Sequence, residues 1–323
     1  MGMLIDGEWV QDSHVRKTEG GRFKRATTVF RDWITADGSG GFKAAPGRYH
    51  LYISLACPWA HRTLIVRKLK GLEDTIGLSV VDCHMGDDGW AFSDAPGAIP
   101  DDINGARFLR DIYLKADPHN TGRVSVPVLW DKEKETIVNN ESAEIIRMFN
   151  SAFDEWGDPG LDLYPEDLRA EIDAVNARVY ADINNGVYRS GFATTQEAYE
   201  EAFAALFAAL DEMEARLGST RYVAGDRITE ADWRLFPTLL RFDPVYVGHF
   251  KCNLRRIADY PNLSNYLREL YQLPGIGETV NMDHIKTHYY GSHRSINPTG
   301  IVPVGPEIDL DAPHDRGRLA QAA

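Results

Sequence analysis

Residues 48–70 have the sequence RYHLYISLACPWAHRTLIVRKLK, and this stretch decides the fold of the first part of the chain. Residues 48–54 alternate and are rich in aromatic and branched side chains, which predicts a β-strand. From Cys57 onward the apolar residues recur at helical spacing, which predicts a helix to about Lys70. Residues 78–81, Leu-Ser-Val-Val, predict a second strand. A strand, a helix and a strand within about 35 residues indicate a βαβ unit.

The following residues predict a short helix, a hairpin and a further helix. The short helix is expected near 108–115, the hairpin strands at 124–131 and 136–138, and the further helix at 143–150. Proline cannot donate a hydrogen bond to a neighbouring strand. The Val126-Pro127 step therefore marks an edge strand, a bulge or a cis turn.

After about residue 160 the pattern becomes helical. Long helices are expected at 165–182, 196–217 and 231–245, with shorter ones near 262–271 and 277–284. Thr229 and Asp232 have the spacing of a capping box, which would stabilise the start of the third long helix.

This switch predicts an α/β domain followed by an all-α domain, with the main boundary near residue 160. Four parts are expected: an irregular N-terminal extension, a mixed α/β domain, an all-helical domain and an extended tail, at 1–45, 46–155, 160–295 and 296–323. Scattered aromatic residues in the extension argue against full disorder.

Composition excludes several functions. The net charge of the 323 residues is -13, which argues against a nucleic-acid partner and against docking on an anionic membrane. No stretch approaches the roughly 18 apolar residues of a membrane span, and the N-terminus lacks the pattern of a signal peptide. The chain has three cysteines and no CxxC pair, which favours the reducing cytoplasm. The histidines lack metal-ligand spacing, so no metal is expected.

Cys57 is the candidate nucleophile. It follows a strand and opens a helix, where unpaired N–H groups and the helix dipole favour a thiolate. Pro58 suits the first helical position because its missing N–H is not needed there. A dithiol reductase would carry a second cysteine where this chain has Ala60, so a mixed disulfide on Cys57 must be resolved by an external thiol. Glutathione is the abundant cytosolic choice. Cys83 and Cys252 are predicted to be structural, and a structural role is the alternative for Cys57.

Two segments suit the binding of a peptide such as glutathione. Backbone next to Val126-Pro127 can pair with an extended peptide in β fashion, although a plain edge-strand proline is the alternative. Glu141-Ser142 opens a helix whose N–H groups and Ser142 hydroxyl can bind a carboxylate. Glu141 can accept the γ-glutamyl amine. The alternative for Ser142 is a helix N-cap and nothing more.

Together these pieces resemble the glutathione transferase superfamily, with its thioredoxin-like N-terminal domain and helical C-terminal domain. Closer still, the chain resembles the Xi class, the glutathionyl-hydroquinone reductases, over about residues 5–306. Five segments in order carry this resemblance: 54–62 (SLACPWAHR), 123–131 (RVSVPVLWD), 138–144 (VNNESAE), 183–188 (INNGVY) and 288–293 (HYYGSH).

The resemblance implies a glutathione-dependent reduction of glutathionyl-hydroquinones by a homodimer. The Cys57 thiolate would attack the sulfur of the conjugate, release the hydroquinone and form a mixed disulfide, which a second glutathione resolves. Tyr188 and Tyr289 match the family's substrate-site tyrosines, and Tyr290 is an adjacent alternative to Tyr289.

The family match also adds residues to the glutathione site. Trp90 matches a residue that lines this site, and Arg123 matches one that helps to hold the glutathione carboxylate. With Val126, Pro127, Glu141 and Ser142 they complete the expected site.

Two other functions are compatible with parts of the sequence. An omega-like thioltransferase acting on protein–glutathione disulfides or dehydroascorbate would share Cys57 and the glutathione site. The Asn-Gly-Val-Tyr and His-Tyr-Tyr segments argue against it. A non-catalytic assembly module is the third possibility, and the joint presence of Cys57, Val126-Pro127 and Glu141-Ser142 argues against that.

Overall fold

The predicted βαβ unit is present in a computed structural model, which describes residues 2–11 and 19–319. Two parallel strands, β5 and β6, are connected by the helix α1 (Pro58–Leu69). They belong to a four-stranded sheet with the order β6-β5-β7-β8, in which β7 is antiparallel to both of its neighbours. The strand bounds are β5 (Tyr49–Ile53), β6 (Gly77–Val80), β7 (Val128–Asp131) and β8 (Thr136–Asn139).

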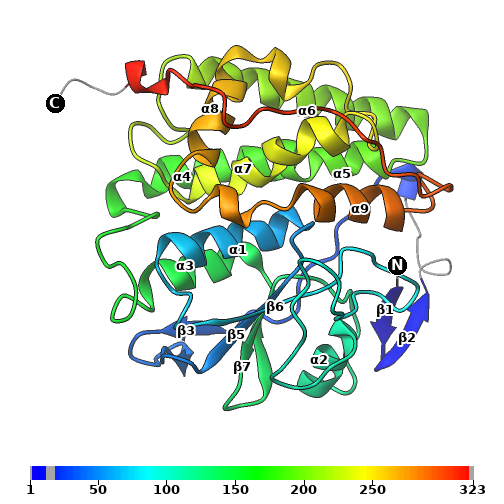
Figure 1. Cartoon of the computed structure of the whole chain (residues 1–323), viewed down its shortest axis with the longest axis vertical. Helices are drawn as coiled ribbons and strands as arrows, with labels where there is room; N and C mark the ends of the chain where they lie inside the picture. The colour runs from blue at the N-terminus through cyan, green and yellow to red at the C-terminus, as the bar shows by residue number, and fades with distance from the viewer. Residues whose placement is uncertain (1, 12–18, 320–323) are drawn as a thin grey trace. The chain divides into compact units, whose positions relative to one another are not determined.

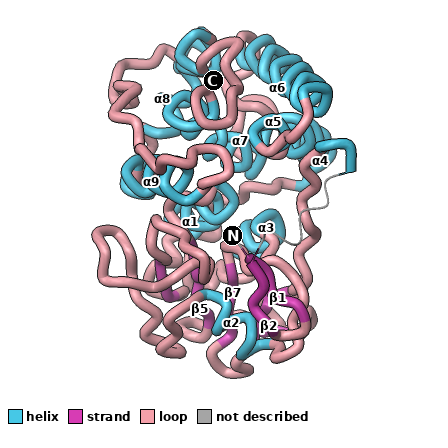
Figure 2. The backbone as a smooth tube through the Cα atoms, turned by 90° about the vertical axis from the view of Figure 1, so that its right-hand side faces the viewer, coloured by secondary structure: helices cyan, strands magenta, loops and turns pink. Residues whose placement is uncertain are grey.

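Helices cover both faces of this sheet. Figure 1 shows α1 and α3 (Ser142–Ser151) on one side of the sheet and α2 (Leu109–Ala116) on the other. The order β-α-β, then α, then β-β-α is the thioredoxin-like arrangement. The same part of the chain also forms two separate two-stranded sheets. One is the antiparallel hairpin of β1 (Gly2–Ile5) and β2 (Glu8–Gln11), and the other is the parallel pair of β3 (Trp33–Thr35) and β4 (Gly41–Lys43). Figure 2 shows how much of this part of the chain is loop.

The strand predicted at 124–131 is wrong in its first half. β7 begins only at Val128, after a cis peptide bond between Val126 and Pro127. β7 lies between β5 and β8, so each backbone N–H in it faces one of these two neighbours and must be paired, and Pro127 has no N–H to donate. Of the three alternatives for this step, the cis turn is confirmed.

The second half of the chain is helical, as predicted. Its helices are α4 (Arg169–Arg178), α5 (Gly186–Gly191), α6 (Gln196–Leu217), α7 (Glu230–Arg241) and α8 (Pro261–Tyr271). π-helical turns follow α4 at Val179–Asn184 and α7 at Phe242–Tyr246. The capping box is confirmed, because Asp232 accepts from the Thr229 N–H at 2.8 Å and Thr229 Oγ1 accepts from Ala231 at 3.3 Å.

The helix predicted at 277–284 is wrong in its position. Gly277–Thr279 forms only a 3₁₀ turn, and α9 runs from Met282 to Ser292. The start of α9 is defined by Asn281, whose Oδ1 accepts the His284 N–H at 2.9 Å. Asparagine favours this N-cap position because its side chain satisfies an N–H that the helix leaves unpaired.

The described residues group into two compact units. The first unit holds residues 2–11, 25–162 and 279–292, and the second holds 19–24, 163–278 and 293–319. The helix α9 therefore groups with the sheet, and residues 19–24 group with the helices. The four-part division at 45, 155–160 and 295 stays a prediction.

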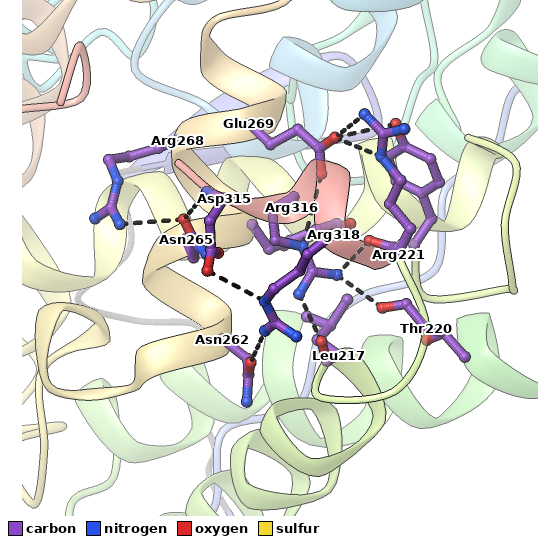
Figure 3. Close-up of polar contacts among 12 residues, drawn as sticks. Leu217, Thr220, Arg221, Asn262, Asn265, Arg268, Glu269, Asp315, Arg316 and Arg318 are labelled. Carbon is purple, nitrogen blue, oxygen red and sulfur yellow. Dashed lines mark hydrogen bonds and ion pairs between the residues drawn. The ribbon is translucent and has the colours of Figure 1, made fainter. Parts of the chain in front are cut away.

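Arg316 attaches the C-terminal tail to helices of the second unit, and its contacts are drawn in Figure 3. Arg316 lies in a 3₁₀ turn at Arg316–Leu319 and is fully buried. Its Nη1 donates to the Leu217 carbonyl at 2.5 Å, and its Nη2 donates to the carbonyls of Thr220, at 2.7 Å, and Arg221. Leu217 is the last residue of α6, so a cation meets the negative end of this helix.

Among the described residues, no helix has the length and apolar character needed to cross a membrane.

Candidate functional site

Four strand ends meet at one edge of the main sheet. β5 and β6 run parallel and end there with the paired residues Ile53 and Val80. β7 begins there, because Val128 pairs with Tyr52, and the antiparallel β8 ends there at Asn139. The segments next to these strand ends hold most of the predicted site residues: Cys57 after β5, Trp90 after β6, Arg123, Val126 and Pro127 before β7, and Glu141 and Ser142 after β8.

Cys57 is the N-cap residue of α1. Its backbone is extended (φ -79°, ψ 122°), and Pro58 occupies the first helical position, as the sequence predicts. The Cys57 Sγ donates to the Val126 carbonyl across 3.6 Å. The half-buried thiol thus lies at a helix N-terminus and touches the cis-proline turn, so two of the predicted site segments are brought into direct contact.

Glu141, and not Ser142, is the N-cap residue of α3. Glu141 Oε1 accepts the Ala143 N–H at 3.2 Å, and its Oε2 accepts from the Thr28 hydroxyl at 3.4 Å. The N-cap alternative for Ser142 is therefore wrong. Ser142 is the first helical residue, and its buried Oγ has no hydrogen-bond partner among the described residues. A buried hydroxyl without a partner at a helix N-terminus is suited to an anionic ligand.

Trp90 is buried and stacks on His288, with ring centroids 4.6 Å apart and planes 23° apart. His288 Nδ1 lies 3.2 Å from the Cys83 carbonyl oxygen. Because a carbonyl only accepts, Nδ1 carries the proton in this bond. His288 also packs edge-to-face on buried Tyr289 at 5.4 Å. One imidazole therefore touches a predicted glutathione-site residue and a predicted substrate-site residue. Tyr290 is half-buried.

The remaining predicted residues have separate surroundings. Arg123 Nη1 donates to the Gly2 carbonyl at 3.3 Å, which connects it to the N-terminal hairpin. Tyr188, on α5, belongs to the second unit and packs among aromatic rings there, including those of Phe192 and Phe250.

No group of three or more histidine, cysteine or acidic side chains in the described residues could hold a metal ion.

Sequence reasoning missed two cations that contact Trp59. The ring of Trp59, two residues after Cys57, lies 4.6 Å from the Arg25 guanidinium carbon and 4.8 Å from that of buried Arg62. The Trp59–Arg62 spacing of three residues in a helix could have indicated one of these contacts. Nothing in the local sequence indicates Arg25, because it comes from the N-terminal extension.

Iodoacetamide at pH 7 is expected to alkylate Cys57 at least about tenfold faster than the other two cysteines. Burial, with a contribution from Asp82, raises the pKa of the Cys83 thiol, and burial raises the pKa of Cys252 to about 12. The thiolate is the nucleophile, so a raised pKa slows alkylation at pH 7, and Cys252 stays slow even at pH 9. Peptide mass spectrometry over time measures the three rates. Equal rates at Cys57 and Cys83 would contradict the assignment.

Family models match both halves of the chain. Residues 56–152 match the glutathione S-transferase N-terminal domain, and residues 196–269 match the glutathione S-transferase C-terminal domain. These matches confirm the predicted fold class.

Full-length relatives are also similar to the chain. Glutathionyl-hydroquinone reductase YqjG of Escherichia coli K12 is 57% identical, with 98% of each chain covered. Glutathionyl-hydroquinone reductase PcpF of Sphingobium chlorophenolicum is 58% identical over 96% of this chain and 98% of that protein.

Solved structures agree with these relatives. The glutathione-bound structure of YqjG superposes with a TM-score of 0.91 at 56% identity, covering 98% of this chain and 99% of that one. A Xi class glutathione transferase from Natrialba magadii superposes with a TM-score of 0.93 at 52% identity, covering 99% of this chain and 98% of that one.

Proposed function

The chain belongs to the glutathionyl-hydroquinone reductases, the Xi class of the glutathione transferase superfamily, and on this premise we propose that it reduces glutathionyl-hydroquinones through Cys57. The observation that carries the proposal is the thiol of Cys57, at the N-terminus of α1 and 3.6 Å from the Val126 carbonyl. As an enzyme of this superfamily it performs a glutathione-dependent reduction. The route and the roles below are proposed.

The first step transfers the glutathionyl group to the enzyme. The Cys57 thiolate attacks the sulfur of the conjugate, a sulfur–sulfur bond forms, and the bond between that sulfur and the ring carbon breaks. The electron pair stays on the ring carbon, which takes up a proton, and the hydroquinone leaves. A second glutathione thiolate then attacks the mixed disulfide, which gives glutathione disulfide and returns the Cys57 thiolate. Two electrons pass from the two glutathionyl sulfurs to the ring.

Glutathione is held by the segments at the sheet edge. The backbone beside Val126-Pro127 pairs with the peptide in β fashion, and the N-terminus of α3 with the Ser142 hydroxyl binds a carboxylate. Glu141 accepts a hydrogen bond from the γ-glutamyl amine through Oε2, since Oε1 caps α3. Trp90 lines this site and Arg123 neutralises a carboxylate. The Ser142 Oγ, which has no hydrogen-bond partner within residues 2–11 and 19–319, supports this assignment.

Tyr188 and Tyr289 are assigned to the hydroquinone ring oxygens on the strength of the family resemblance. A phenolic O–H can hold such an oxygen and stabilise the leaving ring. Tyr289 is preferred to Tyr290 because Tyr289 packs against His288, which itself stacks on Trp90. We also propose that the chain acts as a homodimer, which sedimentation equilibrium measures directly.

The glutathione conjugate of menadiol, supplied with excess glutathione, tests this function. Free menadiol and glutathione disulfide are expected to form in a ratio of one to one. Hydroxyethyl disulfide and dehydroascorbate, offered separately, test the omega-like alternative. Activity on these two and none on the conjugate would replace the proposed function and leave the tyrosine assignments without support.

A further inference from the structure

The short segment of residues 19–24, here called the 19–24 segment, is bound to the helical unit by three different contacts. The Thr194 N–H donates to the Gly21 carbonyl at 3.0 Å, and the Thr195 hydroxyl donates to the Gly20 carbonyl at 3.1 Å. Arg22 donates from Nε and Nη2 to one oxygen of Glu201, at 2.9 and 2.8 Å. These contacts all lie at the start of α6 or just before it.

Gly21 is required where the segment meets Thr195. Its φ is +75°, a region that side-chain-bearing residues rarely adopt, and an added Cβ would lie 2.6 Å from the Thr195 hydroxyl and methyl. The segment is therefore docked in one defined backbone conformation, and the direction of the next side chains is set with it.

Phe23 follows Gly21 and Arg22 in the 19–24 segment, and its side chain packs on α5 and on the residue after α5. Its ring stacks on Phe192, with centroids 5.4 Å apart, and on Tyr188, with centroids 6.4 Å apart. Tyr188 and Phe192 stack on each other at 6.2 Å, with planes 15° apart. The three rings form a nearly parallel set, since Phe23 makes angles of 28° and 29° with the other two.

The other contacts of the Tyr188 ring include buried residues of the helical unit. Phe250 and Tyr246 contact Tyr188 at 5.4 and 6.2 Å, and both are fully buried. Phe250 in turn packs directly over Gly191, where a Cβ would lie 2.1 Å from its ring. Phe23 is half-buried and comes from another part of the chain. It is therefore the less buried contact in a set whose other members, Phe192, Tyr246 and Phe250, are buried.

We propose that Phe23 is a positioning residue that orients the Tyr188 phenol for aromatic substrates. The inference rests on the proposed function, in which Tyr188 holds a hydroquinone oxygen. A tyrosine ring is placed by two side-chain torsions, and neighbouring rings restrict both. Removing Phe23 leaves the Tyr188 ring in contact with fewer neighbouring rings, so its hydroxyl spends less time in the direction that a hydroquinone needs. The N-terminal extension thereby contributes to substrate selection through residues 19–24.

Phe23→Ala is expected to lower kcat/KM for the menadiol conjugate about tenfold. Activity on the mixed disulfide of glutathione and mercaptoethanol, which offers no ring to orient, is expected to change less than about twofold. Phe23→Tyr keeps the ring and is expected to restore the wild-type ratio of the two activities. Phe23→Leu keeps apolar volume without a stacking face, so it shows the same selective loss if Phe23→Ala does not fold.

Phe203→Ala is the matched control. Phe203 is also half-buried in the helical unit and packs on two aromatic rings, Tyr199 at 5.4 Å and Phe207 at 4.7 Å. Its loss is expected to leave the ratio of the two activities unchanged. Equal losses on both substrates in the Phe23 variants, or no loss on either, would overturn the positioning role while the reductase function stands. A wild type inactive on the conjugate would overturn both.

Discussion

Cys57→Ser is expected to lower kcat/KM for a glutathionyl-hydroquinone by at least about 10³-fold. A serine hydroxyl at the same N-terminus of α1 stays protonated at neutral pH, and an alkoxide would not form a disulfide with glutathione. The first step of the proposed route therefore has no nucleophile. Binding is expected to survive, because a serine hydroxyl can still donate to the Val126 carbonyl and the start of α3 is unchanged.

The measurement combines rate and mass. Menadiol release is followed for wild type and variant, and the intact mass is recorded after the conjugate is added without free glutathione. The wild type should gain one glutathionyl group and the variant none. Cys83→Ser is the matched control. Cys83 follows the end of β6, as Cys57 follows the end of β5, and burial raises the pKa of its thiol. If Cys57→Ser retains activity and Cys83→Ser loses it, Cys57 is not the nucleophile.

Arg316→Ala is expected to lower the free energy of unfolding by about 2–4 kcal/mol. The substitution removes a fully buried guanidinium and leaves the Leu217, Thr220 and Arg221 carbonyls without these donors. It also removes the cation 3.7 Å from buried Glu269, although Arg221 still pairs with that carboxylate at 2.6 Å. A cavity beside Tyr266 adds to the cost.

Arg318→Ala is the control for this prediction. Arg318 lies in the same 3₁₀ turn, but its side chain is about half exposed and pairs with Asp315 at 3.2 Å. Loss of this exposed pair is expected to change the free energy by less than about 0.5 kcal/mol. Urea unfolding followed by circular dichroism compares the two variants. Equal destabilisation would mean that the tail is held by the turn as a whole and not by the buried guanidinium.

Local patterns predicted the bounds of an element well where its capping residues and its apolar periodicity agree. The helix at 196–217 was predicted at its observed bounds, because Thr195 caps its start through a 3.3 Å bond to the Ala198 N–H and Gly218 follows its end. Prediction failed at residues 124–127 and 277–284. There a proline and an asparagine cap outweigh the apolar periodicity that suggested a strand and a helix.

The candidate site divides along the same line. Cys57 and the Val126-Pro127 and Glu141-Ser142 segments could be predicted, because strand–turn–helix patterns carry their geometry within a few residues. The Trp90–His288 stack, the two arginines on Trp59 and the Phe23–Tyr188 stack join residues far apart in the chain. No local pattern encodes such contacts.

By itself, then, the sequence determined which residue is placed at the start of the first helix and where the chain changes from strands to helices. It also determined that Cys57 has Ala60, and not a second cysteine, at the spacing of a CxxC pair. These follow from period, capping and spacing, which act over a few residues. The tertiary structure alone decided that Ser142 is buried with a hydroxyl that no other described residue pairs, and that Arg316 donates to the last carbonyl of α6. Only the tertiary structure placed an extension residue against Tyr188. Burial and ring stacking arise when distant segments pack, so they become definite only in the folded chain.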